Sequence, residues 1–208
     1  HFGSETTTGL IKKFRLGSSL KNNSNVVFWQ IDIDKKIRAG KIMEYDAETG
    51  KRKSIPRWAH ENEEDYNLVQ CFFGEQHIKA NTPIAIVESE KTAIIMSVIL
   101  PHMIWLACGG EKHLTKQKCK VLLGMNDITL FPDEGKYHSW NELRLKCDLY
   151  GSGISKDCEN WFKAGLIEKG EDIADYYLRK YKGKLKPKKI DPDWEEFVLD
   201  NPHLNLDL

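Results

Sequence analysis

Two acidic residues follow apolar runs that are typical of buried strands. Glu88 comes directly after residues 83–87, Pro-Ile-Ala-Ile-Val, and Asp133 comes directly after residues 128–132, Ile-Thr-Leu-Phe-Pro. Parallel strands bring such residues to the carboxyl edge of an open α/β sheet, where these folds bind ligands. Carboxylate oxygens at that edge suit Mg²⁺. The first hypothesis is therefore a metal-dependent phosphate chemistry.

The composition sets limits on the class of protein. The chain has 208 residues and 40% hydrophobic content, enough for a globular core in one domain or two small ones. Its 31 basic and 31 acidic residues balance, which argues against a protein that coats nucleic acid by bulk charge. The five cysteines include no C-x-x-C pair, so reduced thiols are expected rather than a zinc ribbon or a disulfide framework. Without a signal peptide pattern or an apolar run near the roughly 20 residues of a membrane span, we expect a cytoplasmic protein.

The pattern of elements changes near residue 80. Residues 10–80 predict a β-rich subdomain, with a hairpin formed by residues 26–33 and 37–45. In residues 83–181 strands and helices alternate, which requires crossovers and predicts an α/β domain with a parallel sheet flanked by helices. We predict strands at 84–87, 104–107, 128–131 and 153–155, and helices at 92–100, 111–122, 137–149, 158–167 and 173–181. Residues 182–208 form a charged tail that could hold a short helix.

The two strand ends also carry a family resemblance. Residues 87–93, V-E-S-E-K-T-A, and residues 130–135, L-F-P-D-E-G, resemble the Toprim domain of bacterial primases, a Rossmann-like fold. In that family one strand ends in a glutamate and a later strand ends in D-x-D. The resemblance implies that Glu88 acts in acid/base transfer or metal binding, that Lys91 assists electrostatically, and that Asp133 is the principal Mg²⁺ ligand.

A third segment fits the same order. Residues 171–178, E-D-I-A-D-Y-Y-L, resemble the primase K-D-x-N-D-x-L segment, whose acids lie near the metal site. The resemblance implies that Asp172 and Asp175 are metal ligands or lie just behind the ligands. Asp172 also stands where a helix should start after Gly170, so helix capping is the alternative role. Asp175 lies one turn later on the same face.

Three positions depart from the family pattern. Ser89 replaces a glycine, Thr92 replaces an aspartate, and Gly135 replaces the second acid of D-x-D. Glu134 is a candidate to compensate as a metal ligand, although on an extended backbone it points away from Asp133. With fewer carboxylates, Mg²⁺ or Mn²⁺ is expected to bind weakly or with the help of substrate phosphates.

The resemblance extends upstream. Residues 28–52 and the later C-F-F-G-E at 71–75 resemble a primase-associated Toprim family carried on bacterial mobile elements. Its members often have a zinc ribbon ahead of this region. Because the first residue is His1 rather than Met, we expect the natural chain to begin earlier.

Basic residues in the first half invite a nucleic-acid interpretation, since cations neutralise phosphates and neighbouring aromatic rings stack on unpaired bases. The alternative is the charged face of a half-buried sheet. The candidates for nucleic-acid binding are Arg38, Lys41, Lys51, Arg52, Lys53 and Arg57.

The function expected from these features is Mg²⁺-dependent, primase-like nucleotidyl transfer in the replication or transfer of mobile-element DNA. DNA and nucleoside triphosphates are the expected partners, together with replication or mobilisation proteins. Two alternatives stay open. One is a non-catalytic nucleic-acid-binding or replication-adaptor module with a degenerate metal site, and the other is a Toprim nuclease.

Overall fold

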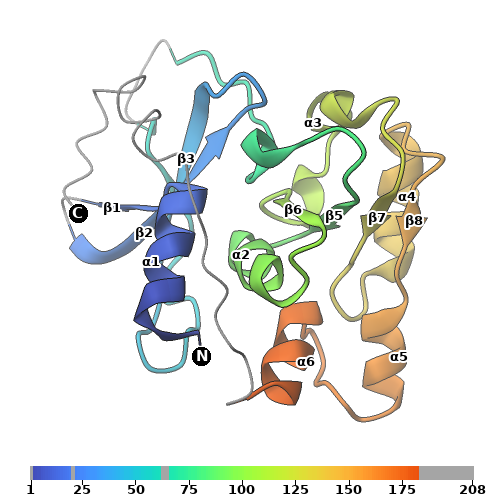
Figure 1. The fold of residues 1–208 in the computed structure, drawn as a ribbon. Helices are drawn as coiled ribbons and strands as arrows, with labels where there is room; N and C mark the ends of the chain where they lie inside the picture. The colour runs from blue at the N-terminus through green and yellow to red at the C-terminus, as the bar shows by residue number, and fades with distance from the viewer. Residues whose placement is uncertain (1, 20–21, 62–65, 183–208) are drawn as a thin grey trace. The chain divides into compact units, whose positions relative to one another are not determined.

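The computed structural model describes residues 2–19, 22–61 and 66–182. Within these residues the chain divides into two compact units (Figure 1). One unit consists of residues 2–30 and 37–69, and the other consists of residues 31–36 and 70–182. The predicted tail at 182–208 lies outside the described residues, apart from its first residue.

The first unit contains a helix and a four-stranded sheet in the order β1-β2-β3-β4. The predicted hairpin is present as β2 and β3, which are neighbours in this sheet. Helix α1 was not predicted from the sequence. It buries Thr6, Leu10 and Phe14 along one stripe and ends where Arg15 adopts a left-handed conformation at φ 53°. The bounds are α1 Gly3–Phe14, β1 Gly17–Ser19, β2 Asn22–Ile31, β3 Ile37–Glu44 and β4 Arg57–Trp58.

The second unit contains a four-stranded parallel sheet in the order β6-β5-β7-β8. Strand β5 lies between β6 and β7, with Ile86 opposite Leu106 on one side and Leu130 on the other. All four residues of β5 are buried, as expected for a central strand of a parallel sheet. The bounds agree with the predicted strands to within one residue: β5 Ile84–Val87, β6 Ile104–Ala107, β7 Ile128–Leu130 and β8 Gly153–Ile154.

Helices flank this sheet. Four predicted helices are present with shifted ends, and α5 stops early because the chain turns at Gly165, where φ is +68°. The predicted helix at 111–122 is wrong as one element, because Leu114 and Thr115 adopt extended conformations and divide it into three short turns. The bounds are η1 Glu75–His77, α2 Glu90–Ile99, η2 Glu111–His113, α3 Lys116–Cys119, η3 Lys120–Leu122, α4 Tyr137–Lys146, α5 Asp157–Lys163 and α6 Ile173–Lys180. None of the helices in the described part of the chain has the length and apolar character needed to cross a membrane.

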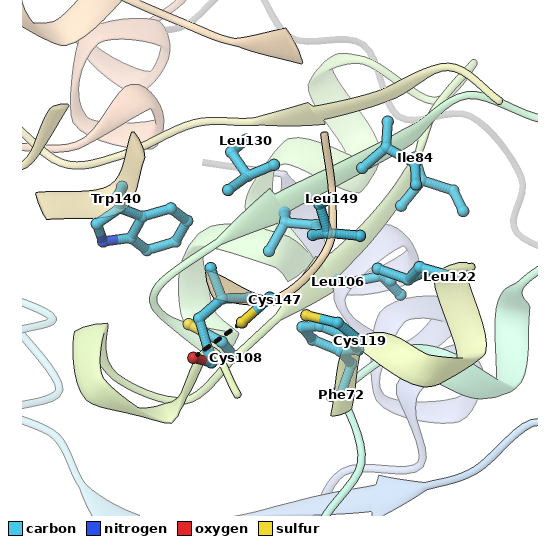
Figure 2. Packing of buried hydrophobic residues seen from close by; sticks show 13 residues of the cluster. Phe72, Ile84, Leu106, Cys108, Cys119, Leu122, Leu130, Trp140, Cys147 and Leu149 are labelled. Carbon is cyan, nitrogen blue, oxygen red and sulfur yellow. Dashed lines mark hydrogen bonds between the residues drawn. The ribbon is translucent and has the colours of Figure 1, made fainter. Parts of the chain in front are cut away.

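One face of the parallel sheet carries the main hydrophobic core of this unit. Alternate residues of the strands, including Ile86 of β5 and Leu130 of β7, pack with Trp140 of α4 and with side chains from the turns after β6. Figure 2 shows this cluster, in which Cys147 Sγ donates to the carbonyl of Leu114 at 3.6 Å. The other residues of these strands face the opposite side, where α2 packs along β5 and β6.

The outer edge of β6 is paired with another segment at Ala107. The backbone N–H of Phe73 donates to the carbonyl of Ala107, and the N–H of Ala107 donates to the carbonyl of Phe73, both at 3.0 Å. Phe73 itself is completely buried. This antiparallel bridge ties the segment before β5 to the edge of the sheet.

All five cysteines are free and buried. Burial raises the pKa of the Cys108 thiol to about 12 and raises the pKa of Cys119, Cys147 and Cys158 as well. Thiols in this environment behave as small hydrophobic side chains. These buried thiols therefore contribute to packing, a role that the sequence did not indicate.

The core predicts a large difference between two leucines of this unit. Leu130 is fully buried, whereas Leu123 is 53% exposed. We expect Leu130→Ala to lower the free energy of unfolding by about 2 to 5 kcal/mol, because it leaves a cavity. The control Leu123→Ala should change it by about 0.5 kcal/mol or less. Urea unfolding followed by circular dichroism measures both, and equal effects would contradict the assigned core.

Candidate functional site

Glu88 and Asp133 lie at the same edge of the parallel sheet. Glu88 follows β5, and Asp133 follows β7 after Phe131 and Pro132. The two strands are hydrogen-bonded neighbours, and the N–H of Phe131 donates to the carbonyl of Ile86 at 2.8 Å. The parallel register therefore brings both acids to the carboxyl ends of adjacent strands, as the sequence analysis predicted.

The Asp133 carboxyl is in an environment that disfavours its charge. Burial, followed by the charges of Asp172, Glu88 and Asp175, raises the pKa of Asp133 to about 8, and Lys136 opposes this effect. Desolvation and neighbouring carboxylates both favour the protonated form. Four acids thus act on one another at this edge, and functional sites are a common place for such perturbed groups.

Asp172 is the N-cap of helix α6. Its Oδ1 accepts hydrogen bonds from the backbone N–H groups of Ala174 at 2.8 Å and Asp175 at 3.1 Å. Asp175 Oδ2 accepts in return from the N–H of Asp172 at 3.1 Å, which completes a capping box. The capping alternative for Asp172 is therefore confirmed.

Thr92 ties this cap to the neighbouring helix. Its hydroxyl donates to Asp172 Oδ2, and the Thr92 side chain is almost fully buried on α2. Both oxygens of Asp172 are thus used within the protein. The position where the family pattern has an aspartate holds a neutral donor, which stabilises the Asp172 carboxylate without adding a further negative charge.

Lys91, in the first turn of α2, acts through its charge on Asp175 of α6. Burial and the charge of Asp172 raise the pKa of Asp175, whereas Lys91 lowers it. The ammonium of Lys91 therefore belongs to the charge balance of the acidic cluster.

Glu134 is bonded to the loop before α6. Its Oε2 accepts from the N–H of Gly170 at 2.8 Å, and its own N–H donates to the carbonyl of Glu171 at 3.0 Å. The next residue, Gly135, turns the chain at φ +78° and donates its N–H to Glu159 Oε1 at 3.0 Å. Glu134 therefore binds the loop before α6, and its role as a compensating metal ligand stays a prediction.

The donor set suits an ion that takes few protein ligands. In the described residues, no group of three or more His, Cys, Asp or Glu side chains is arranged to hold a metal ion. Both oxygens of Asp172 and one oxygen of Asp175 accept hydrogen bonds within the protein, and Glu88 and Asp133 are the other two acids of the cluster. Mg²⁺ commonly binds through one or two carboxylates together with substrate phosphates and water, and this arrangement fits that mode.

The sequence analysis missed an ion pair next to the acids. Lys136 Nζ donates to Glu111 Oε2 at 2.8 Å, and the Ser139 hydroxyl donates to Glu111 Oε1 at 2.5 Å. These bonds lower the pKa of Glu111. Glu111 follows β6, so the rule that placed Glu88 and Asp133 at the sheet edge could also have placed Glu111 there.

The six basic candidates for nucleic-acid binding all belong to the other unit. Lys41 is buried on β3, with 6% of its surface exposed. Lys53 pairs with Asp46 at 3.5 Å, and Arg57 pairs with Glu61 at 3.9 Å. Lys51, Arg52, Lys53 and Arg57 are exposed, and Arg38 is partly buried. Nucleic-acid binding by the exposed residues of this group stays a prediction.

Comparisons with known proteins give one family match and a fold similar to that of a phage primase fragment. A family model described as "Domain of unknown function (DUF6371)" matches residues 1–134. No curated protein matches the sequence. The primase fragment of the bacteriophage T7 primase-helicase protein has a TM-score of 0.54 at 12% identity, covering 84% of this chain and 66% of that one. The E. coli primase catalytic core has a TM-score of 0.46 at 14% identity, covering 97% of this chain and 66% of that one.

These structural similarities concern the fold. The chain is a mixed α/β protein with a parallel sheet flanked by helices, similar to the phage primase fragment. It spans slightly less than two thirds of that fragment.

The Asp133 environment predicts how stability depends on pH. Between its ordinary pKa of 3.8 and about 8, the folded protein keeps the Asp133 proton while the unfolded chain has lost it. The Asp133 contribution to the free energy of unfolding therefore falls as pH rises through this window and levels off above it. We expect Asp133→Asn to be more stable than wild type by about 1 to 3 kcal/mol at pH 9, with no difference at pH 4. Urea unfolding at both pH values tests this, and a destabilised Asp133→Asn at pH 9 would contradict it.

The α6 cap predicts a difference between two substitutions of Asp172. Asp172→Ala should lower the free energy of unfolding by about 1 to 2 kcal/mol, because the N–H groups of the first turn lose their acceptor. Asp172→Asn should retain most of the stability, since asparagine caps helices as well as aspartate. Thermal unfolding of the two variants makes the comparison. Equal losses would show that the negative charge, rather than the cap, stabilises this turn.

Proposed function

This chain belongs to the family described as a domain of unknown function, DUF6371, so we propose its function from its own acidic site. We propose that it is a Toprim-type, primase-like protein that carries out Mg²⁺-dependent nucleotidyl transfer on mobile-element DNA. The observation that supports this most is the coupled pair Glu88 and Asp133 at adjacent strand ends, with the pKa of Asp133 raised to about 8. In this proposal residues 83–181 are the Toprim-type domain and residues 10–80 are the β-rich subdomain.

Glu88 and Asp133 would hold the metal ion. Asp172 and Asp175 form the α6 cap next to these ligands and would not bind the ion directly. When bound, Mg²⁺ neutralises the negative charge of the triphosphate. Because Asp133 holds its proton at neutral pH, binding of a cation there displaces that proton, and affinity for the ion rises as pH approaches and passes about 8.

The protein's own groups would then act on the 3′-hydroxyl. Glu88 accepts the proton of this hydroxyl while the hydroxyl oxygen attacks the α-phosphate, and pyrophosphate leaves. Lys91, which acts on Asp175 through its charge, offsets part of the negative charge of the cluster. Holding the hydroxyl and the α-phosphate in line is the main contribution of such a site. DNA and nucleoside triphosphates are the proposed partners, along with replication or mobilisation proteins.

A second candidate function is a non-catalytic nucleic-acid-binding or replication-adaptor module. It is favoured by the loss of two carboxylates, since Thr92 binds Asp172 and Gly135 stands after Glu134 in the turn. The described residues also contain no ready group of three metal donors. The exposed basic residues of the other unit would then carry the binding.

Calorimetry with matched variants tests the proposal. We expect Mg²⁺ and Mn²⁺ to bind wild-type protein at pH 8.5 in the presence of a single-stranded oligonucleotide and nucleoside triphosphates. Glu88→Gln and Asp133→Asn should abolish this binding, whereas Glu142→Gln, an exposed carboxylate on α4, should not change it. In a primer-synthesis assay the first two variants should lose about 100-fold or more of the rate.

Other outcomes select other functions. DNA binding that ignores Mg²⁺ and survives Asp133→Asn would favour the adaptor. Cleavage of labelled plasmid in Mn²⁺ without primer synthesis would favour a nuclease. A metal site that persists in both Glu88→Gln and Asp133→Asn would refute the assignment of these carboxylates as ligands.

A further inference from the structure

Lys136 stands at the end of the turn that carries Asp133. Its N–H donates to the carbonyl of Asp133 at 3.0 Å, and the positive φ of Gly135 allows the chain to close this turn. Lys136 is also the residue from which α4 begins. The turn therefore places a cation within a few residues of the acid at the end of β7.

The Lys136 ammonium is held in place by a residue of the turn after β6. Glu111, in the turn after β6, accepts from Lys136 Nζ at 2.8 Å through one carboxylate oxygen. Its other oxygen accepts from the hydroxyl of Ser139 on α4 at 2.5 Å. A carboxylate fixed at both oxygens restricts the lysine side chain, so a ligand that binds the ammonium costs less conformational entropy.

The fixed ammonium is accessible to a ligand. The Lys136 side chain is 43% exposed, compared with 25% for Glu111. An ammonium has three N–H donors, and the bond to Glu111 needs one of them. Lys136 can therefore keep its ion pair while it donates to an oxygen that arrives from solvent.

The charges around Lys136 indicate which chemical group the ligand oxygen belongs to. The bond to Glu111, with further contributions from Glu88 and Asp133, raises the pKa of Lys136, so the group stays a cation over the working pH range. A phosphate that approaches this edge is repelled by the ionised carboxylates there, which include Asp133 above about pH 8. A fixed cation that acts on the same two acids is suited to offset this repulsion.

We propose that Lys136 is a substrate-binding residue that donates to a phosphate of the substrate beside Glu88 and Asp133. This inference rests on the proposed function, because it assigns a phosphate contact at the same site. Glu111 and Ser139 are positioning residues that act through Lys136.

Isothermal titration with a matched pair of variants tests the assignment. The probes are inorganic triphosphate in saturating Mg²⁺, and Mg²⁺ alone, both at pH 8.5. Lys136→Met should weaken triphosphate binding about tenfold, the loss of one charge-assisted hydrogen bond. It should tighten the binding of Mg²⁺ alone by roughly threefold, because a neighbouring cation is removed. The control Lys146→Met, on the same helix and in an exposed pair with Glu142, should change both constants by about twofold or less.

The opposite signs separate a phosphate contact from a structural role. If Lys136→Met weakens both constants together and lowers the unfolding temperature, or leaves triphosphate affinity equal to wild type, the assignment is wrong. Wild-type protein that does not bind triphosphate also refutes it. Triphosphate binding that depends on Lys136 but is accompanied by no primer synthesis supports the inference and refutes the nucleotidyl transfer. Primer synthesis that Lys136→Met leaves unchanged would support the nucleotidyl transfer and refute the role of Lys136.

Discussion

The parallel pairing of β5 with both β6 and β7 is the constraint on which the candidate site depends. This register aligns the carboxyl ends of three strands, so Glu88, Glu111 and Asp133 follow neighbouring strands although they are distant in sequence. A shift of one residue would turn the side chains of a strand to the opposite face of the sheet. The buried alternation around Ile86 and Leu130 fixes the register, and packing in the core thereby determines the electrostatics at its edge.

The charges at that edge are balanced by several groups rather than by one partner. Burial among other acids favours the protonated form of Asp133. The oxygens of Asp172 accept hydrogen bonds from the first turn of α6 and from Thr92. Lys91 and Lys136 supply positive charge from two different helices. Such a cluster is costly to fold in its ionised form, as is common where stability is traded for function.

The sequence was sufficient for features that depend on local pattern. Short apolar runs predicted β5, β6 and β7 to within one residue, and Asp172 after Gly170 indicated a cap that the structure confirms. Helix α1 was missed. The turns at 111–122 were merged into one predicted helix because their composition is helical, although Thr115 adopts an extended conformation that interrupts it. The direction of Glu134 and the Lys136 ion pair depend on contacts with Gly170 and Glu111, which are distant in sequence. No local pattern encodes such contacts.

The bridge between Phe73 and Ala107 has a consequence for how this protein behaves at high concentration. Exposed strand edges present unpaired N–H and carbonyl groups, and these groups recruit further chains into intermolecular sheets. Phe73 occupies both hydrogen-bonding groups of Ala107 on the β6 side. On the other side, β8 extends over only Gly153–Ile154. Both features limit the edge-to-edge pairing that leads to aggregation.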